Sequence, residues 1–215
     1  MNSAPALSAS EFVAHTDGLS LPSVASVAEM STDTMRQVVQ LYTTAFQSYF
    51  LSWLAQTALA AKSALAREVA LENLAVEQSE NHPDLLYHFA ESAMALPTSI
   101  GQSWLHAHLH DIQLLFAQSE SNLGGVALIA LLENYSLRFI PVLDAIGVRL
   151  CLAKHARRYT QVHGEADIAH AHRFSLALDA EIAVTDLKKV PDKLLQVRLA
   201  VQRLVNRIYS AGEIF

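Results

Sequence analysis

Apolar side chains recur every three to four residues along most of the chain, which is the period of an α-helix. The longest such pattern runs from about Thr34 to Ser79. This is longer than a typical globular helix, so we expect a break or a kink within it. Alternation with a period of two does not persist beyond a few residues, so strands are not expected. The pattern therefore predicts an all-α protein.

Proline and glycine residues divide the remainder of the chain into further helical segments. The expected helices span residues 83–96, 99–119, 124–143, 147–159, 162–185 and 191–209. We expect Pro141 to bend or end the third of these, and Gly147 to begin the fourth. Together with the first long pattern, they predict a bundle of seven to eight helices.

The first 30 residues differ from the others, because they are rich in Ser and Ala and contain Pro5 and Pro22. We expect residues 1–30 to form an arm or a tail, and residues 31–215 to form one helical-bundle domain. The start of the chain lacks the basic residues of a targeting signal, and the longest apolar stretch is far shorter than the ~20 residues that span a bilayer. These features predict a cytoplasmic protein that does not associate with membranes.

Composition narrows the function classes further. The 215 residues are 52% hydrophobic and only 17% charged, which argues against a disordered chain. The net charge is −6 and the 15 Lys and Arg residues are scattered, so no nucleic-acid surface is expected. Cys151 is the only cysteine, which excludes an intramolecular disulfide and a Cys-rich metal site. The unusual feature is the presence of ten histidines.

One histidine motif has the spacing of a metal site. His163, Asp167 and His170 stand at positions i, i+4 and i+7, so they share one face of a predicted helix. Two imidazoles and one carboxylate on a common face form a ligand set that suits Fe(II), Mn(II) or Zn(II). The alternative is a solvated polar face without a ligand.

Three other residues could supply ligands from other walls of the bundle. Glu77 and His82 flank the place where Pro83 interrupts the helical pattern, although both also suit an ordinary helix end. Glu133 stands within a nearly pure apolar helix. If it is buried, its carboxylate needs a cation, hydrogen-bond donors or a proton; if it lies at the helix edge, it needs none of these.

The order of these residues resembles the heme-oxygenase-like diiron oxidases and oxygenases, which include the group of the chlamydial death-domain-associating protein. The pattern is Glu then His, then a lone Glu on an apolar helix, then His-x3-Asp-x2-His. The segments Asn73-Leu74…Glu77 and His82-Pro83-Asp84-Leu85…Tyr87 match motifs of that family. The resemblance covers residues 34–205 approximately and implies a heme-oxygenase-like, TenA-like bundle.

The resemblance implies two Fe(II) per chain, or an Fe/Mn pair, with O2 as co-substrate. The implied ligands are Glu77, His82, Glu133, His163, Asp167 and His170. Because Glu77 and His82 are closely spaced, Glu72 and Glu80 could each replace Glu77. The implied function is oxidation of a small organic substrate (an amino acid, an amine or a fatty acid) in a biosynthetic pathway. We also expect a homodimer and an external electron donor.

Candidate catalytic residues and competing functions follow from the same resemblance. Tyr42 and Tyr135 are candidate redox-active neighbours of the metals, and Arg138 is a candidate for binding a substrate carboxylate, although core packing and a surface ion pair explain such residues equally well. A self-sacrificing 4-aminobenzoate synthase is an alternative, but the helix around Glu133 lacks the lysine of that branch. Two further candidate functions are a thiaminase-like hydrolase that uses Cys151 and a non-catalytic helical interaction module.

Overall fold

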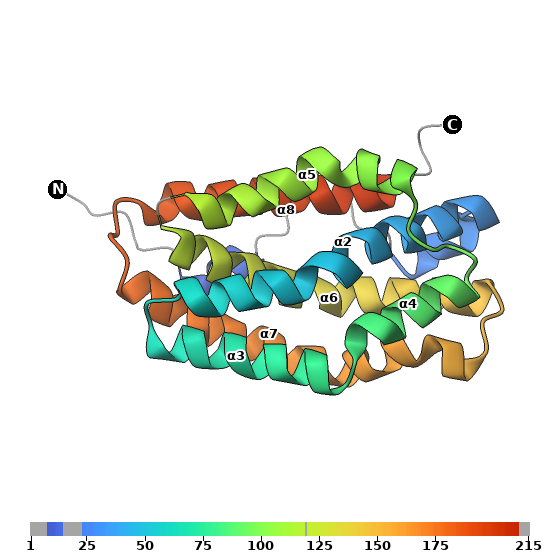
Figure 1. Ribbon diagram of the computed structural model, residues 1–215, viewed down its shortest axis with the longest axis horizontal. Helices are drawn as coiled ribbons and strands as arrows, with labels where there is room; N and C mark the ends of the chain where they lie inside the picture. The colour runs from blue at the N-terminus through green and yellow to red at the C-terminus, as the bar shows by residue number, and fades with distance from the viewer. Residues whose placement is uncertain (1–7, 15–22, 119, 211–215) are drawn as a thin grey trace.

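All regular secondary structure is helical in residues 8–14, 23–118 and 120–210, which this computed structural model describes. The elements are α1 (Ala9–Ala14), η1 (Ala25–Glu29), α2 (Thr32–Ala60), α3 (Ala64–Ser79), α4 (His82–Ser92), α5 (Ser99–Ala117), α6 (Ser121–Arg149), η2 (Lys154–Arg157), α7 (Arg158–Ala183) and α8 (Val190–Tyr209). The long helices run along the long axis of the molecule (Figure 1). The predicted all-α bundle is confirmed.

Helix α6 forms the centre of the bundle, and α2, α5, α7 and α8 pack around it. Its residues from Asn122 to Glu133 are all buried, which explains why the sequence is apolar on every side of this helix. Among the described helices, α6 is the one long and apolar enough to cross a membrane, but 72% of its apolar window is buried inside the bundle. Such burial is typical of the core helix of a soluble protein.

The predicted break in the first long helix is confirmed, and it lies between Ala60 and Ala64. Ser63 caps α3 by accepting a hydrogen bond from the amide of Ala66 at 3.0 Å. The buried carboxylate of Glu181 on α7 accepts hydrogen bonds from the amides of Lys62 at 3.0 Å and Ser63 at 2.9 Å. An anion at this helix N-terminus satisfies amides that have no partner within the helix.

Pro141 does not end a helix and Gly147 does not begin one, because α6 runs through both to Arg149. Pro141 lies on the exposed side of the helix, where water can hydrate the carbonyl that loses its partner. Gly147 serves close packing instead: a Cβ there would lie 2.9 Å from Arg157 Cδ and 3.0 Å from Phe89. The expected helix over 147–159 is replaced by a turn and η2.

The described part of the N-terminal arm packs on the bundle. The amide of Ala9 donates a hydrogen bond to Asp179 Oδ1 on α7 at 2.8 Å, and Phe12 is fully buried. The guanidinium of Arg198 lies 5.4 Å from the centre of the Phe12 ring. Residues 1–7 and 15–22 of the expected arm lie outside the described residues.

Candidate metal centre

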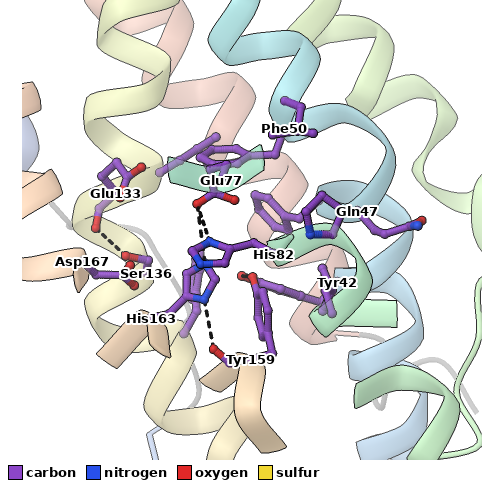
Figure 2. A pocket seen from close by; sticks show the side chains of 16 residues that line it. Tyr42, Gln47, Phe50, Glu77, His82, Glu133, Ser136, Tyr159, His163 and Asp167 are labelled. Carbon is purple, nitrogen blue, oxygen red and sulfur yellow. Dashed lines mark hydrogen bonds and ion pairs between the residues drawn. The ribbon is translucent and has the colours of Figure 1, made fainter. Parts of the chain in front are cut away.

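Helices α3, α4, α6 and α7 bring the six expected ligands together inside the bundle, and Figure 2 shows five of them, all except His170. They form two groups, Glu77 with His82 and His163, and Glu133 with Asp167 and His170. Within each group, one possible ligand atom from each side chain lies within 4.8 Å of the other two. Residues up to 93 positions apart in the sequence, 77 and 170, thus meet at one place.

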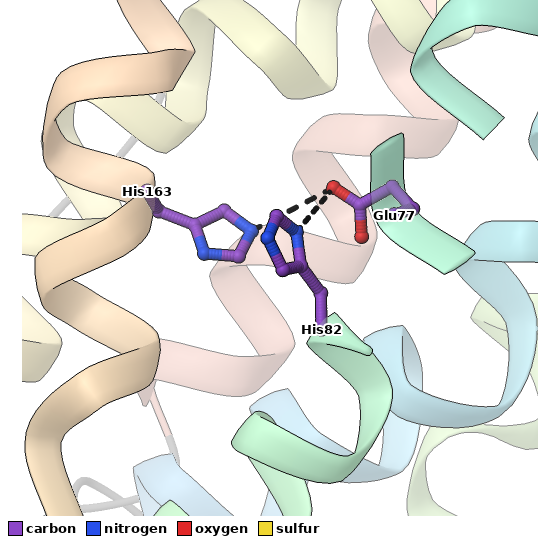
Figure 3. Close-up of side chains that lie close together, drawn as sticks. All are labelled: Glu77, His82 and His163. Carbon is purple, nitrogen blue, oxygen red and sulfur yellow. Dashed lines mark hydrogen bonds and ion pairs between the residues drawn. The ribbon is translucent and has the colours of Figure 1, made fainter. Parts of the chain in front are cut away.

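The first group depends on the tight connection between α3 and α4. Asn81 adopts the left-handed conformation (φ 55°) between the two helices, and His82 at the start of α4 lies against Glu77 on the preceding helix. His82 Nδ1 lies 2.9 Å from Glu77 Oε1, and His163 Nε2 lies 3.8 Å from the same oxygen (Figure 3). Glu80 approaches the other nitrogen of His82 at 3.0 Å, but its side chain is 56% exposed against 6% for Glu77.

The orientation of His163 is set within its own helix. His163 Nδ1 lies 3.0 Å from the backbone carbonyl of Tyr159, one turn earlier, which leaves Nε2 directed at Glu77. Glu72, the second residue that could have replaced Glu77, forms an ion pair with Arg173 outside both groups. Of the three candidate glutamates, the structure therefore buries Glu77 inside the first group.

The second group contains two buried carboxylates with few hydrogen-bond donors or positive charges near them. Asn73 Nδ2 donates a hydrogen bond of 2.7 Å to Glu133 Oε1, and His170 Nδ1 lies 3.9 Å from Glu133 Oε2. Asp167 is buried, and its Oδ2 has no hydrogen-bond partner among the described residues. A buried oxygen without a partner is costly, and a cation is one group that would satisfy it.

Burial and like charge oppose ionisation of the second group. Burial raises the pKa of Glu133 well above its usual value, the charges of Asp167 and Glu77 raise it further, and the Asn73 hydrogen bond opposes this only in part. Burial also raises the pKa of Asp167.

In the first group, by contrast, the surroundings favour the ionised form of the carboxylate. Burial would raise the pKa of Glu77, but interactions with His163 and His82 outweigh burial and lower it to about 2. A set of three acids and three imidazoles, with one buried carboxylate oxygen unpaired, fits divalent cations.

A pocket of about 570 Å³, open mouth included, adjoins both groups. Beside five of the six expected ligands, it is lined by Tyr42, Phe46, Gln47, Phe50, Leu51, Pro83, Leu86, Leu132, Ser136, Phe139 and Tyr159. The hydroxyls of Tyr42 and Tyr159 lie 3.1 Å apart, and both side chains are buried. Burial raises the pKa of both phenols, so both stay protonated at neutral pH.

The other catalytic candidates lie elsewhere. Tyr135 is fully buried against Phe139 and is not among the residues that line the pocket. Burial raises the pKa of its phenol to about 12. Arg138 is exposed, and so is Cys151, which adopts a left-handed conformation (φ 58°) just after α6. Of the residues suggested as catalytic, the structure thus brings Tyr42 to the pocket.

Two residues next to the ligands were missed as functional candidates by the sequence analysis. Asn73, noted there only as part of a family motif, holds Glu133, and Tyr159 contacts both Tyr42 and His163. Each stands four residues before an expected ligand, Asn73 before Glu77 and Tyr159 before His163. The helical spacing that grouped the histidines could therefore have identified both.

No family model and no curated protein matches the chain. Among solved structures, the chain is similar to a TenA homolog from Pseudomonas syringae pv. tomato str. DC3000, with a TM-score of 0.63 and 16% sequence identity. The match covers 97% of this chain and 95% of that protein. At this identity the similarity shows the fold alone, and it confirms the TenA-like, heme-oxygenase-like bundle.

Proposed function

We propose that this protein is a non-heme diiron oxidase or oxygenase that uses O2 to oxidise a small organic substrate. The observation that supports it is the meeting of three carboxylates and three imidazoles from four helices beside a pocket. Incidental polar residues would not be expected to bury three acids together, because burial of uncompensated charge is costly.

In this proposal each group of three side chains holds one metal ion. Glu77, His82 and His163 hold the first ion, and Glu133, Asp167 and His170 hold the second. Three carboxylates reduce the +4 charge of two divalent ions to about +1, which a buried site tolerates better. Two Fe(II), or one Fe and one Mn, would supply the electrons and the open coordination positions that O2 activation needs.

The chain's own residues orient the ligands and exclude water. Asn73 holds the Glu133 carboxylate, and the Tyr159 carbonyl fixes the ring of His163. Phe46 and Phe139 help to form an apolar wall next to the ligands, which would separate a bound substrate from bulk water. A small-molecule substrate, an external electron donor and a homodimer belong to this proposal, whereas nucleic acid and membranes do not.

The self-sacrificing synthase is the second candidate. Tyr42 supports it, because this tyrosine lines the pocket in which the expected ligands lie. However, α6 contains no lysine from Val126 to Leu143, and this branch places its lysine on the helix of the lone Glu. Mass spectrometry after turnover separates the two functions, since the synthase alone would lose mass from its own chain.

Metal uptake tests the proposed function. Anaerobic reconstitution should load two Fe(II) per chain, and adding O2 should produce a transient visible absorption and consume the gas. His163→Ala and Glu133→Ala should abolish this uptake while circular dichroism remains that of the parent. His172→Ala is the matched control, because His172 lies on the same helix as His163 but is exposed. A parent chain that takes up no Fe(II) would refute the proposal.

A further inference from the structure

The wall of the candidate pocket carries no formal charge apart from the expected metal ligands. Seven of the other eleven lining residues are purely apolar, and the remaining four are Tyr42, Gln47, Ser136 and Tyr159. Among the described lining residues, there is thus no cation that could pair with a substrate carboxylate. Arg138, the candidate for this role, lies outside the pocket.

The acids of the pocket are equally poor partners for a substrate ammonium. Glu77 already faces two imidazoles, and Glu133 accepts a hydrogen bond from Asn73. Asp167, whose Oδ2 has no partner among the described residues, is unavailable to an ammonium once it holds a metal ion. In the proposed function these carboxylates also hold the metals. A buried charge without a counter-charge is strongly unfavourable, so an amino acid or a cationic amine would bind poorly here.

The two buried phenols can supply a hydrogen-bond donor to a molecule in the pocket. Tyr42 and Tyr159 share one hydrogen bond, in which one hydroxyl donates to the other. The hydrogen of the second hydroxyl has no other acceptor among the described residues. A buried O–H seeks an acceptor, which a ligand oxygen next to the phenols would provide.

We propose that this pocket binds a molecule with an apolar body and one oxygen-bearing polar group, and without an ammonium group. This inference deepens the proposed function as to its substrate class, but binding itself does not require the metals. The polar group can be a neutral hydroxyl or carbonyl or a carboxylate, because each has an oxygen that accepts a hydrogen bond. The residual positive charge of a metal-loaded centre would favour the carboxylate.

Four probes test the inference on the full chain: the eight-carbon molecules 1-octanol, octanoate and octylamine, and the six-carbon amino acid norleucine. Their binding is measured by isothermal titration calorimetry before and after the chain is loaded with Zn(II). We expect 1-octanol to bind both forms, and octylamine and norleucine not to bind the Zn(II)-loaded form. Tighter binding of octanoate than of 1-octanol to the loaded form would identify a carboxylate as the polar group, and the reverse order would identify a neutral one. Octylamine or norleucine binding to the loaded form as tightly as 1-octanol would overturn the inference.

A matched pair of variants locates the bound probe. Leu51 lines the pocket, whereas Leu59, eight residues later on α2, is 85% exposed. Leu51→Asp should weaken 1-octanol binding at least tenfold, and Leu59→Asp should leave it unchanged. Equal binding by both variants would refute the pocket as the binding site. Octanol binding without Fe(II) uptake would refute the proposed function alone, and Fe(II) uptake without octanol binding would refute this inference alone.

Discussion

The first prediction tests whether the buried Glu181 carboxylate stabilises the start of α3. This fully buried carboxylate accepts hydrogen bonds from the amides of Lys62 and Ser63 and from Asn122 Nδ2, at 3.0, 2.9 and 2.6 Å. Removing it leaves the Ser63 amide and the part-buried Lys62 amide without an acceptor, and leaves Asn122 Nδ2 with only its 3.3 Å hydrogen bond to Thr185. Each lost hydrogen bond costs about 1–3 kcal/mol before relaxation. Because such losses are not additive and water can enter, we expect Glu181→Ala to lower the free energy of unfolding by about 3–5 kcal/mol.

Urea unfolding of the metal-free chain, followed by circular dichroism, measures this loss. Glu181→Gln retains one acceptor oxygen, so it should cost less, about 1–3 kcal/mol. Glu68→Ala on α3 is the control, because Glu68 is exposed and its loss should change stability by no more than about 0.5 kcal/mol. If Glu181→Ala costs no more than Glu68→Ala, the carboxylate does not hold the start of α3, and the reasoning fails.

Three further predictions concern the centre and the helices that carry it. Asn73→Ala should weaken Fe(II) binding about 10–100-fold by anaerobic titration, since it frees the Glu133 carboxylate, and unchanged affinity would exclude this positioning role. In the metal-free chain, the raised pKa of Glu133 means that its contribution to stability is present below about pH 4.3 and is lost as pH rises towards the folded-state pKa. Glu133→Gln should therefore stabilise the metal-free chain at pH 8 and not at pH 4, and the opposite order in urea unfolding would contradict the assigned direction. Gly125→Ala should lower the thermal midpoint, because its Cβ would lie 2.8 Å from Thr57 Oγ1 and 3.3 Å from Thr57 Cα, whereas Gly164→Ala has open space and should gain up to ~1 kcal/mol of helix stability. Equal shifts in the midpoint for the two alanine variants would show that the close approach at Gly125 is not limiting.

Helix period was sufficient for much of the fold and for placing expected ligands on a common helix face. It did not predict their grouping, because His163 joins Glu77 and His82, whereas Asp167 and His170 join Glu133. His163, Asp167 and His170 share a face because the helix repeat alone dictates it. Glu133 could be suspected because an acid in an apolar helix needs compensation, and the structure indeed buries it. These inferences depend on local geometry, which the sequence encodes directly.

Features that depend on contacts between distant segments could not be predicted in this way. Gly147 was expected to begin a helix, yet it lies within α6, where the absence of a side chain lets Arg157 and Phe89 pack closely against the backbone. The uncharged wall of the pocket combines residues of α2, α4, α6 and α7, so it exists only after these helices pack. The pairing of Tyr42 with Tyr159 across 117 positions is of the same kind.

The order of the helices along the chain has a consequence for synthesis on the ribosome. Glu77 and His82 are synthesised early, but the third member of their group, His163, is synthesised much later. In the second group, Glu133 is likewise synthesised before Asp167 and His170. Neither group of three is complete until α7 has been translated, at residue 170 of 215 for the second group. A nascent chain would therefore assemble either group of three side chains only after most of its apolar helices have been synthesised, so the proposed cation binding would be a late event in maturation.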